Sequence, residues 1–378
     1  MIRVGFIGTV PKEWMGGLNY FKNLFFALKS FASKDVEPIV FVGKRTNTEI
    51  KKMFKKHATI IEDSLFDRHS VKWYFSKIIE KLFKSNFFLE RILQKYKCDI
   101  ISHSSIINFK KIKTINWIPD LQHIHLPDMF SKTEIIERNK SFMNIIKYSD
   151  AVVVSSYDTL SDLKNFAPEY YHKINVLHFV SQPIQKYKGL DIRKLEEKYN
   201  INDSFFYMPN QFWKHKNHMT AFKAIDCLKK EGLEVKLICT GHLSDYRNKT
   251  YIEEIYNFIE KSNLDENIKI LGLVDIDDVY TLIKFSKAVI NPSLFEGWSS
   301  TVEECKSVGK NMILSDINVH REQYPTATFF NRKSVQSLKD TIKNYKEDKT
   351  NNKVDLLSTR TKKYADDYVN LTKKVINT

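Results

Sequence analysis

Two glutamates, Glu296 and Glu304, stand eight positions apart in a segment whose pattern suits a ligand that is part sugar and part phosphate. An apolar run that ends at Ile290 precedes them and predicts a buried strand. From Ser300 onward the apolar positions follow a helical spacing, and Gly309 is placed to end that helix. Glu296 is therefore expected in a loop, where its carboxylate can accept hydrogen bonds from hydroxyls. Glu304 is expected about one turn into a helix, whose unpaired N–H groups attract anions.

This segment, NPSLFEGWSSTVEECKSVG, resembles the donor-site signature of family 4 retaining glycosyltransferases, in which seven residues separate two glutamates within a strand, loop and helix. The resemblance implies that Glu296 binds hydroxyls of the transferred sugar and that Glu304 binds the ribose of the nucleotide. It also implies that the N–H groups of Gly297, Trp298 and Ser299 lie near the sugar or its phosphates. The alternative is an ordinary loop glutamate followed by a solvated helix glutamate.

Apolar strand patterns alternate with helical ones along the chain, which predicts an α/β fold with parallel sheets. The resemblance implies the GT-B fold, two Rossmann-like domains facing each other across a cleft. We predict an N-terminal Rossmann-like acceptor domain over 1–182 and, after a polar linker and entry helix at 183–203, a nucleotide-sugar donor domain over 204–350. Residues 351–378 are expected to form a C-terminal helix, which in GT-B proteins usually crosses back to the first domain. Strands are expected near 3–8, 38–42, 100–103, 114–117, 151–155, 205–209, 235–240, 268–272, 288–291 and 312–315.

The loop after the first predicted strand of each domain contains residues suited to a diphosphate. Gly16 and Gly17 open a helix and allow close approach of the backbone, although the GxGxxG pattern of a dinucleotide site is absent. The resemblance implies that this pair lies against the donor diphosphate. In the second domain, Gln211 stands where the family has an arginine and Lys216 where it has a lysine, while Lys214 offers a further positive charge. Asn217 is expected to cap the helix that begins after this loop. A tight turn and a basic surface loop are the alternatives.

The segment WIPDLQHIHLPDMF places Asp120, His123 and His125 just after another predicted strand, at the sheet edge where open α/β sheets bind ligands. Family members have a His-Asp pair here, but Pro119 occupies the histidine position in this chain. We assign the histidine role to His123 first and to His125 second, so His123, Asp120 and Glu296 are the predicted catalytic residues. A structural role for His123 is the alternative, and two histidines at this spacing do not make a zinc site without a third ligand.

Two further acidic positions carry weaker signals. Glu322 lies in a segment resembling one in which family members keep a glutamate near the active cleft, so it joins His125 as a secondary or acceptor-side candidate. Asp275 and Asp277 form an Asp-x-Asp, the metal motif of a different glycosyltransferase fold, but they precede a predicted helix and are expected to cap it. We expect neither a metal nor another cofactor, because the nucleotide-sugar is itself a substrate.

The bulk composition limits the partners. A formal charge of +15 favours anionic ones: nucleic acid, anionic lipid or a phosphorylated substrate. No recognised nucleic-acid-binding motif occurs, so nucleic acid is not expected. Residues 70–97 mix lysines with Trp73, Tyr74, Phe75, Phe83, Phe87 and Phe88, which is typical either of a basic amphipathic surface on an anionic membrane or of an ordinary packed helix pair. Four scattered cysteines and no long apolar segment indicate a soluble protein of the reducing cytoplasm, with binding to the inner face of the membrane as an option.

The predicted function is transfer of a sugar from a nucleotide-diphospho-sugar to a hydroxyl of a saccharide or lipid-linked acceptor, with retention of configuration. Synthesis of cell-surface polysaccharide is a suitable setting. Gln211 and Pro119 leave open a catalytically weak GT-B protein that binds a sugar nucleotide or a partner. A nucleic-acid-binding protein is the third alternative, prompted by charge alone.

Overall fold

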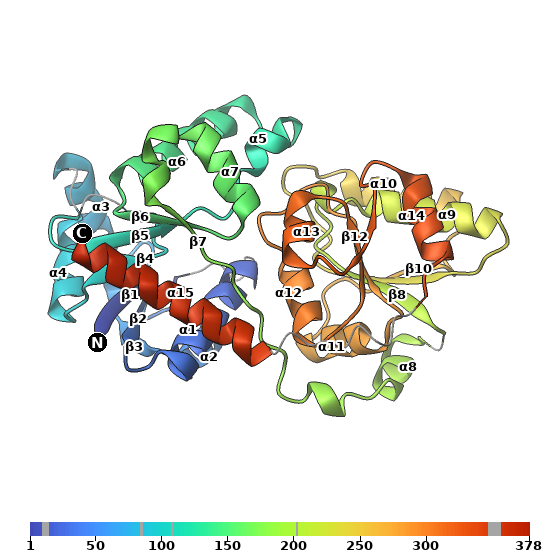
Figure 1. Cartoon of the computed structure of the whole chain (residues 1–378), viewed down its shortest axis with the longest axis horizontal. Coiled ribbons are helices and arrows are strands. Elements are labelled where there is room, and N and C mark those ends of the chain that lie inside the picture. The colour runs from blue at the N-terminus through green and yellow to red at the C-terminus, as the bar shows by residue number, and fades with distance from the viewer. Residues whose placement is uncertain (10–14, 84–85, 107–108, 202, 347–356) are drawn as a thin grey trace. The chain divides into compact units, whose positions relative to one another are not determined.

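The computed structural model describes residues 1–9, 15–83, 86–106, 109–201, 203–346 and 357–378, which form two compact units. The first unit comprises Met1–Leu121 and Lys132–Ser181 together with the C-terminal helix α15 (Leu357–Asn377). The second unit comprises Gln122–Ser131 and the described part of Gln182–Asp355. Each unit is built around one parallel sheet with helices packed on it (Figure 1). The prediction of an α/β fold with two Rossmann-like domains is confirmed.

The sheet of the first unit has the order β3-β2-β1-β4-β5-β6-β7, and its neighbouring strands are parallel. The order reverses between β1 and β4, and ligands of open α/β sheets bind beyond the strand ends at such a point. The strands are β1 (Ile2–Ile7), β2 (Val36–Val42), β3 (Thr59–Glu62), β4 (Ile100–Ser102), β5 (Lys113–Trp117), β6 (Ala151–Val154) and β7 (Ile174–Val176). The helices before α15 are α1 (Met15–Phe31), α2 (Thr48–Lys55), α3 (Val71–Phe83), α4 (Phe87–Lys95), α6 (Lys132–Tyr148) and α7 (Tyr157–Phe166).

The sheet of the second unit has the order β10-β9-β8-β11-β12-β13, with the reversal between β8 and β11. The loops that follow β8 and β11 therefore start side by side at the carboxyl edge. The strands are β8 (Phe205–Pro209), β9 (Lys236–Thr240), β10 (Ile268–Ile270), β11 (Val289–Asn291), β12 (Met312–Ser315) and β13 (Thr328–Phe330). The helices are α5 (Gln122–His125), α8 (Arg193–Tyr199), α9 (His218–Lys230), α10 (Tyr251–Lys261), α11 (Ile276–Phe285), α12 (Ser300–Ser307), α13 (Asn318–Gln323) and α14 (Val335–Lys343). Short 3₁₀ helices lie at Ser64–Phe66, Pro127–Met129, Pro168–Lys173, Tyr187–Gly189 and Lys214–Lys216.

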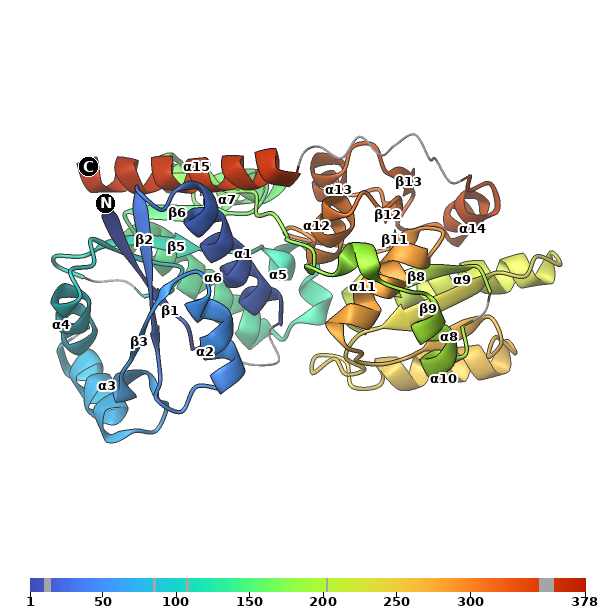
Figure 2. The same ribbon diagram turned by 90° about the horizontal axis from the view of Figure 1, so that it is seen from below.

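The helix α15 packs against α1 in the first unit, although more than three hundred residues separate them in sequence (Figure 2). Two of its tyrosines are fully buried: the Tyr368 ring stacks on Phe6 with centroids 6.3 Å apart, and Tyr364 meets Tyr20 edge-on at 6.5 Å. Large buried aromatic rings dominate core energetics, so α15 contributes to the core of this unit.

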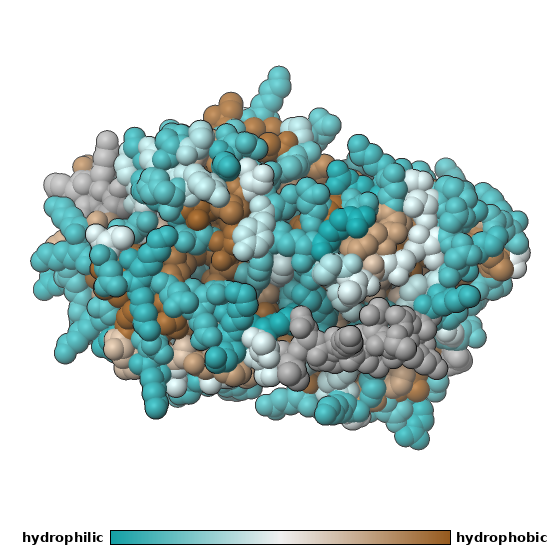
Figure 3. All heavy atoms as spheres, viewed as in Figure 1, coloured by the Kyte–Doolittle hydropathy of each residue, from teal (hydrophilic) through white to brown (hydrophobic). Residues whose placement is uncertain are grey.

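Within the described residues, no helix is both long and apolar enough to cross a membrane. Hydrophilic side chains cover most of the face drawn in Figure 3. Asp275 takes the N-cap position of α11, as expected, but its side chain makes no capping hydrogen bond there and instead lies 3.5 Å from Lys198 Nζ. Asp277 likewise pairs with Lys186. The prediction that this Asp-x-Asp caps α11 is therefore wrong for the side chains, because their carboxylates pair with nearby lysines instead of with the backbone of the helix.

Candidate functional site

The loop between β11 and α12 carries Glu296, and α12 carries Glu304 as its fifth residue. Glu296 is buried, with 9% of its surface exposed, whereas Glu304 is half-buried. The local pattern therefore predicted the element of each glutamate correctly. The three residues after Glu296, which are Gly297, Trp298 and Ser299, complete the approach to the helix, and Trp298 is the half-buried one among them.

Lys216, which is partly buried, forms an ion pair with the buried Glu296, in which Lys216 Nζ donates to Glu296 Oε1 at 2.6 Å. Ser293 Oγ donates to the same oxygen at 2.6 Å. Burial alone would raise the pKa of Glu296, but the charge of Lys216 and the hydrogen bonds from Lys216 and Ser293 together hold that pKa below its usual range. The carboxylate is thus ionised, and the ammonium beside it keeps N–H donors that a phosphate or hydroxyl oxygen can use.

Two amides that the sequence pattern did not single out hold the glutamate loop. Asn291 Nδ2 donates to Ser299 Oγ at 3.0 Å, and its Oδ1 lies 2.7 Å from Ser293 Oγ. Gln323 clamps the backbone of Ser299, accepting from its N–H at 3.0 Å and donating to its carbonyl at 2.8 Å. Gln323 is buried next to the predicted Glu322, which is half-exposed. A polar residue ending an apolar strand could have drawn attention to Asn291, but Gln323 had no such signal.

The loop after β8 lies against the glutamate loop. The Leu294 N–H donates to the His215 carbonyl at 2.8 Å, and Asn217 Nδ2 donates to the Pro292 carbonyl at 3.1 Å. Asn217 has a left-handed backbone (φ 60°) and occupies the N-cap of α9, but it makes no side-chain cap, so the expected capping is wrong. Its side chain joins two loops instead.

The other polar residues of the β8 loop differ in exposure and partner. Gln211 Oε1 accepts from the His242 N–H at 3.0 Å and so supports the loop after β9. Lys214 is exposed, and its backbone N–H donates to Asp245. Lys216 is thus the lysine of this loop that the structure joins to a glutamate.

The segment Gln122–Ser131 packs with the second unit and carries both predicted histidines. His123 is buried, and the His125 ring lies 5.0 Å from the ring of Phe295, the neighbour of Glu296. Arg247 holds this segment. Its Nη1 donates to Gln122 Oε1 at 2.8 Å, and its guanidinium lies 5.3 Å from the centre of the Phe130 ring. Arg247 was not predicted, because nothing in its own neighbourhood in the sequence indicates these distant partners.

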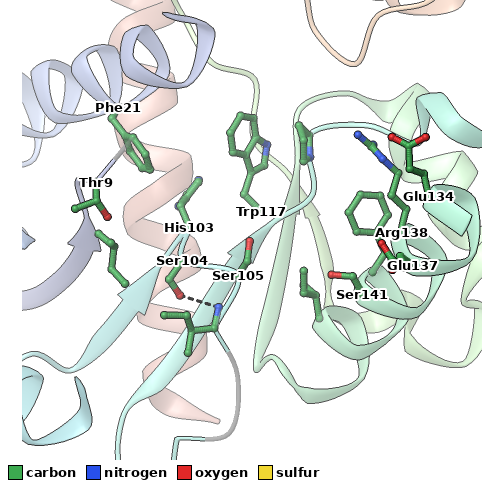
Figure 4. A pocket seen from close by; sticks show the side chains of 15 residues that line it. Thr9, Phe21, His103, Ser104, Ser105, Trp117, Glu134, Glu137, Arg138 and Ser141 are labelled. Atoms are coloured by element: carbon green, nitrogen blue, oxygen red, sulfur yellow. Dashed lines mark hydrogen bonds between the residues drawn. The ribbon is translucent and has the colours of Figure 1, made fainter. Parts of the chain in front are cut away.

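The first unit contains a cavity of about 800 Å³ at the carboxyl ends of its central strands (Figure 4). Thr9, His103 and Trp117 face it from the strand ends, together with Pro119, while α6 contributes charged and hydroxyl groups. The α6 residues are Glu134, Glu137, Arg138 and Ser141. An aromatic wall with several hydroxyls and charges suits a polar ligand with an apolar face, such as a sugar ring. Asp120 is half-buried just beyond Pro119.

The predicted glycine pair lies at the start of α1 in the same unit. Gly16 is exposed and Gly17 is buried. The preceding residues 10–14, between Thr9 and α1, lie outside the described part of the chain.

His103 is a half-buried polar centre at this cavity that sequence reasoning missed. Its Nε2 lies 2.8 Å from the Tyr20 hydroxyl and its Nδ1 lies 2.7 Å from Ser102 Oγ. Burial lowers the pKa of His103 to about 3. The same cause lowers the pKa of His218 to about 3 and that of His320 to about 4. These imidazoles are therefore neutral in the folded protein.

Acid should destabilise the protein through these histidines. The unfolded chain protonates each near the usual pKa of 6.5, whereas folded His103 takes up a proton only near 3. Between these values the unfolded state binds more protons, so the free energy of unfolding should fall by up to about 1.4 kcal/mol per pH unit and per histidine as the pH drops. Urea titrations across this range should show a shallower dependence for His103→Asn, a residue that tolerates the left-handed backbone (φ 57°) found here. An identical slope in this variant would contradict the assignment.

Among the described residues, no group of three or more His, Cys, Asp or Glu side chains is arranged to hold a metal ion.

Comparison with known proteins places this geometry in a fold class. The chain is similar to the crystal structure of a glycosyltransferase from Rickettsia africae, with 16% identity and a TM-score of 0.67 over 100% of this chain and 98% of that one. It is also similar to HepE from Anabaena in complex with UDP and glucose, with 14% identity and a TM-score of 0.66 over 100% and 99% of the two chains. A TarM variant from S. aureus in complex with Fondaparinux, alpha-GlcNAc-glycerol and UDP has 14% identity and a TM-score of 0.63, with 100% of both chains covered. The fold is that of GT-B glycosyltransferases.

A family model is more specific for part of the chain. Residues 191–366 match the model described as "Glycosyl transferases group 1". This match contains the β8 loop, the glutamate loop and α12. Comparison with curated protein sequences finds no match.

Proposed function

We propose that the protein is a retaining glycosyltransferase that moves a sugar from a nucleotide-diphospho-sugar to a hydroxyl of a saccharide or lipid-linked acceptor. The observation that carries this proposal is the ion pair of the partly buried Lys216 with the buried Glu296 at the carboxyl edge of the second sheet, with Glu304 on the helix that follows. The lysine provides a cation that can bind a diphosphate, and the two glutamates provide carboxylates that can accept hydrogen bonds from sugar hydroxyls. The family match over this region and the similar structures determined in complex with UDP support the same ligand class.

Each group in the proposed site has a separate role. Lys216 and backbone N–H groups at helix starts stabilise the leaving diphosphate, which is why no metal cofactor is proposed. Glu296 accepts hydrogen bonds from the transferred sugar and Glu304 from the ribose. The acceptor hydroxyl attacks the anomeric carbon on the face from which the diphosphate leaves and gives its proton to that diphosphate, so the configuration is retained. His123 and Asp120 bind or orient reacting hydroxyls.

The acceptor side and the cellular setting complete the proposal. The cavity of about 800 Å³ in the first unit would receive the acceptor, because its lining combines Trp117 with the carboxylates of Glu134 and Glu137. Gly16 and Gly17 would allow the diphosphate to approach α1. We propose a cytoplasmic enzyme that works at the inner face of the membrane in the synthesis of cell-surface polysaccharide.

Donor binding should be detectable by thermal shift with UDP-, GDP-, ADP- and dTDP-sugars. We expect one donor to stabilise the wild-type protein by RT ln(1 + [L]/Kd), which is about 2.7 kcal/mol at one hundred times Kd. The Glu304→Ala variant should lose most of this stabilisation, because a buried ribose hydroxyl would lack its acceptor. Glu260→Ala, an exposed glutamate on α10, is the matched control and should behave as wild type. Failure of every sugar nucleotide to bind would overturn the proposal.

A catalytically weak sugar-nucleotide-binding protein remains the second candidate, because Gln211 fills the place of the family arginine and its side chain is engaged with His242. An active glycosyltransferase and a binding protein differ in whether they turn over the donor. The enzyme should release the free nucleoside diphosphate from the donor that it binds when acceptors are supplied, whereas a binding protein should leave that donor intact.

A further inference from the structure

The helices α3 and α4 present an apolar surface to solvent. On α3, five large apolar side chains follow the spacing of one helix face, and each is between 51% and 73% exposed: Val71, Tyr74, Phe75, Ile78 and Leu82. A stripe with this spacing normally faces a core. On α4, Phe87 and Phe88 are also exposed, while Leu89 and Leu93 fill the core instead. We call the exposed residues of both helices the α3–α4 face.

A small apolar recess opens between the two helices. It has a volume of about 390 Å³ and is lined chiefly by Leu65, Val71, Phe75, Phe88 and Ile92. Lys72 and Arg91 also line it, together with Asp63. Apolar side chains with cations beside them are suited to an amphiphile that has an anionic head.

The charge of this segment narrows the choice of partner. Residues 70–97 contain seven Lys or Arg and two Glu, a formal excess of five positive charges. A second copy of the chain would bring these like charges together across a symmetric interface, which is unfavourable. The side chains of Lys81 and Phe83 and residues 84–85 lie outside the described part of the structure. An anionic lipid surface complements both the apolar stripe and the charge.

The recess adjoins the cavity proposed for the acceptor. It shares Leu65 with a second recess of about 540 Å³, whose lining includes Arg68 and Trp73. That second recess shares Ile7, Thr9 and Ile106 with the large cavity of about 800 Å³. Three hollows of the first unit therefore follow one another from the α3–α4 face to the strand ends.

We propose that the α3–α4 face docks on an anionic phospholipid bilayer, with Phe75, Ile78 and Leu82 inserted and the neighbouring lysines and arginines on the headgroups. This orientation would offer the large cavity to an acceptor carried on lipid. The consequence for the acceptor rests on the proposed function, but the docking itself does not.

Co-sedimentation with vesicles tests the apolar part of the face. The wild-type protein should pellet with vesicles of phosphatidylglycerol and phosphatidylcholine in equal parts, and much less with phosphatidylcholine alone or at high salt. The triple variant Phe75→Ser, Ile78→Ser and Leu82→Ser should lower the partition coefficient at least about tenfold, because each insertion is driven by buried apolar area. The matched control replaces three exposed apolar residues of the second unit by serine, Tyr256, Leu273 and Ile276, and should bind as wild type.

A second pair of variants tests the charge. Replacing Arg91 and Lys95 by glutamine should weaken binding about fivefold for each charge. Replacing Lys164 and Lys261, which are exposed on α7 and α10, should leave binding unchanged.

Two results would overturn the proposal: a wild-type protein that does not bind anionic vesicles, or a triple variant that binds as wild type does. A wild-type dimer that the triple variant loses, without vesicle binding, would identify a second copy as the occupant instead. Donor stabilisation should be unchanged in all these variants. A wild-type protein that binds anionic vesicles but no sugar nucleotide would contradict the proposed function and still support the docking surface.

Discussion

Replacing Lys216 by methionine is expected to lower kcat at least about 100-fold, the usual effect of removing one group that stabilises charge in a transition state. Lys216 lies 2.6 Å from Glu296 Oε1 and has little exposure, so water would not replace its charge efficiently. Initial rates of nucleoside diphosphate release, measured with the donor that thermal shift identifies, would provide kcat for each variant.

The control for Lys216→Met is Lys214→Met, which replaces an exposed lysine of the same loop. Its kcat should stay within about fivefold of the wild-type value, because exposed charges contribute little. Removing Lys216 also leaves the Glu296 carboxylate buried without its cation, which costs about 3–5 kcal/mol of stability. The double variant Lys216→Met and Glu296→Gln should regain much of this stability but no activity. Equal losses of kcat in both single lysine variants would contradict a special role for Lys216.

Replacing Gly241 by alanine should destabilise the second unit by about 2–5 kcal/mol, combining backbone strain with a steric clash. Gly241 follows β9 with φ +143°, and an added Cβ would lie 2.2 Å from the Asn210 carbonyl oxygen. The clash is with backbone of the β8 loop, so no side chain can rotate away to relieve it. Urea unfolding followed by tryptophan fluorescence would measure the loss.

Gly232 provides the comparison that separates strain from clash. It also has a positive φ, +78°, but an added Cβ meets no atom within 4 Å. Gly232→Ala should therefore cost only about 1 kcal/mol. If Gly241→Ala were no worse than Gly232→Ala, the close approach of the β8 and β9 loops would not matter for stability.

The sequence predicted those features that local patterns encode. Apolar runs located the central strands of both sheets, and the spacing after Ser300 located the helix that carries Glu304. The strands β3, β7 and β13 were missed. All three are sheet edges, and they are too short or too exposed to give a buried apolar run.

Partners distant in sequence could not be predicted in this way. Arg247 meets Gln122 across 125 positions, and Gln323 meets Ser299 across 24. Asn217 was expected to cap α9 because it stands at the right place, but a carbonyl of the glutamate loop is its actual partner. Local rules give a residue's position, whereas its hydrogen-bond partner depends on which loops the fold brings together.

The return of α15 to the first unit has a consequence for biosynthesis. Tyr364 and Tyr368 belong to a core whose other members, Phe6 and Tyr20, are translated first. At about 5–20 residues per second, the ribosome needs tens of seconds to translate the chain between Tyr20 and Tyr364. The second unit is translated almost wholly before α15, so it can fold while the first unit still lacks its last helix. The nascent chain should therefore expose the Phe6 and Tyr20 rings until late, which makes them accessible to a chaperone during translation.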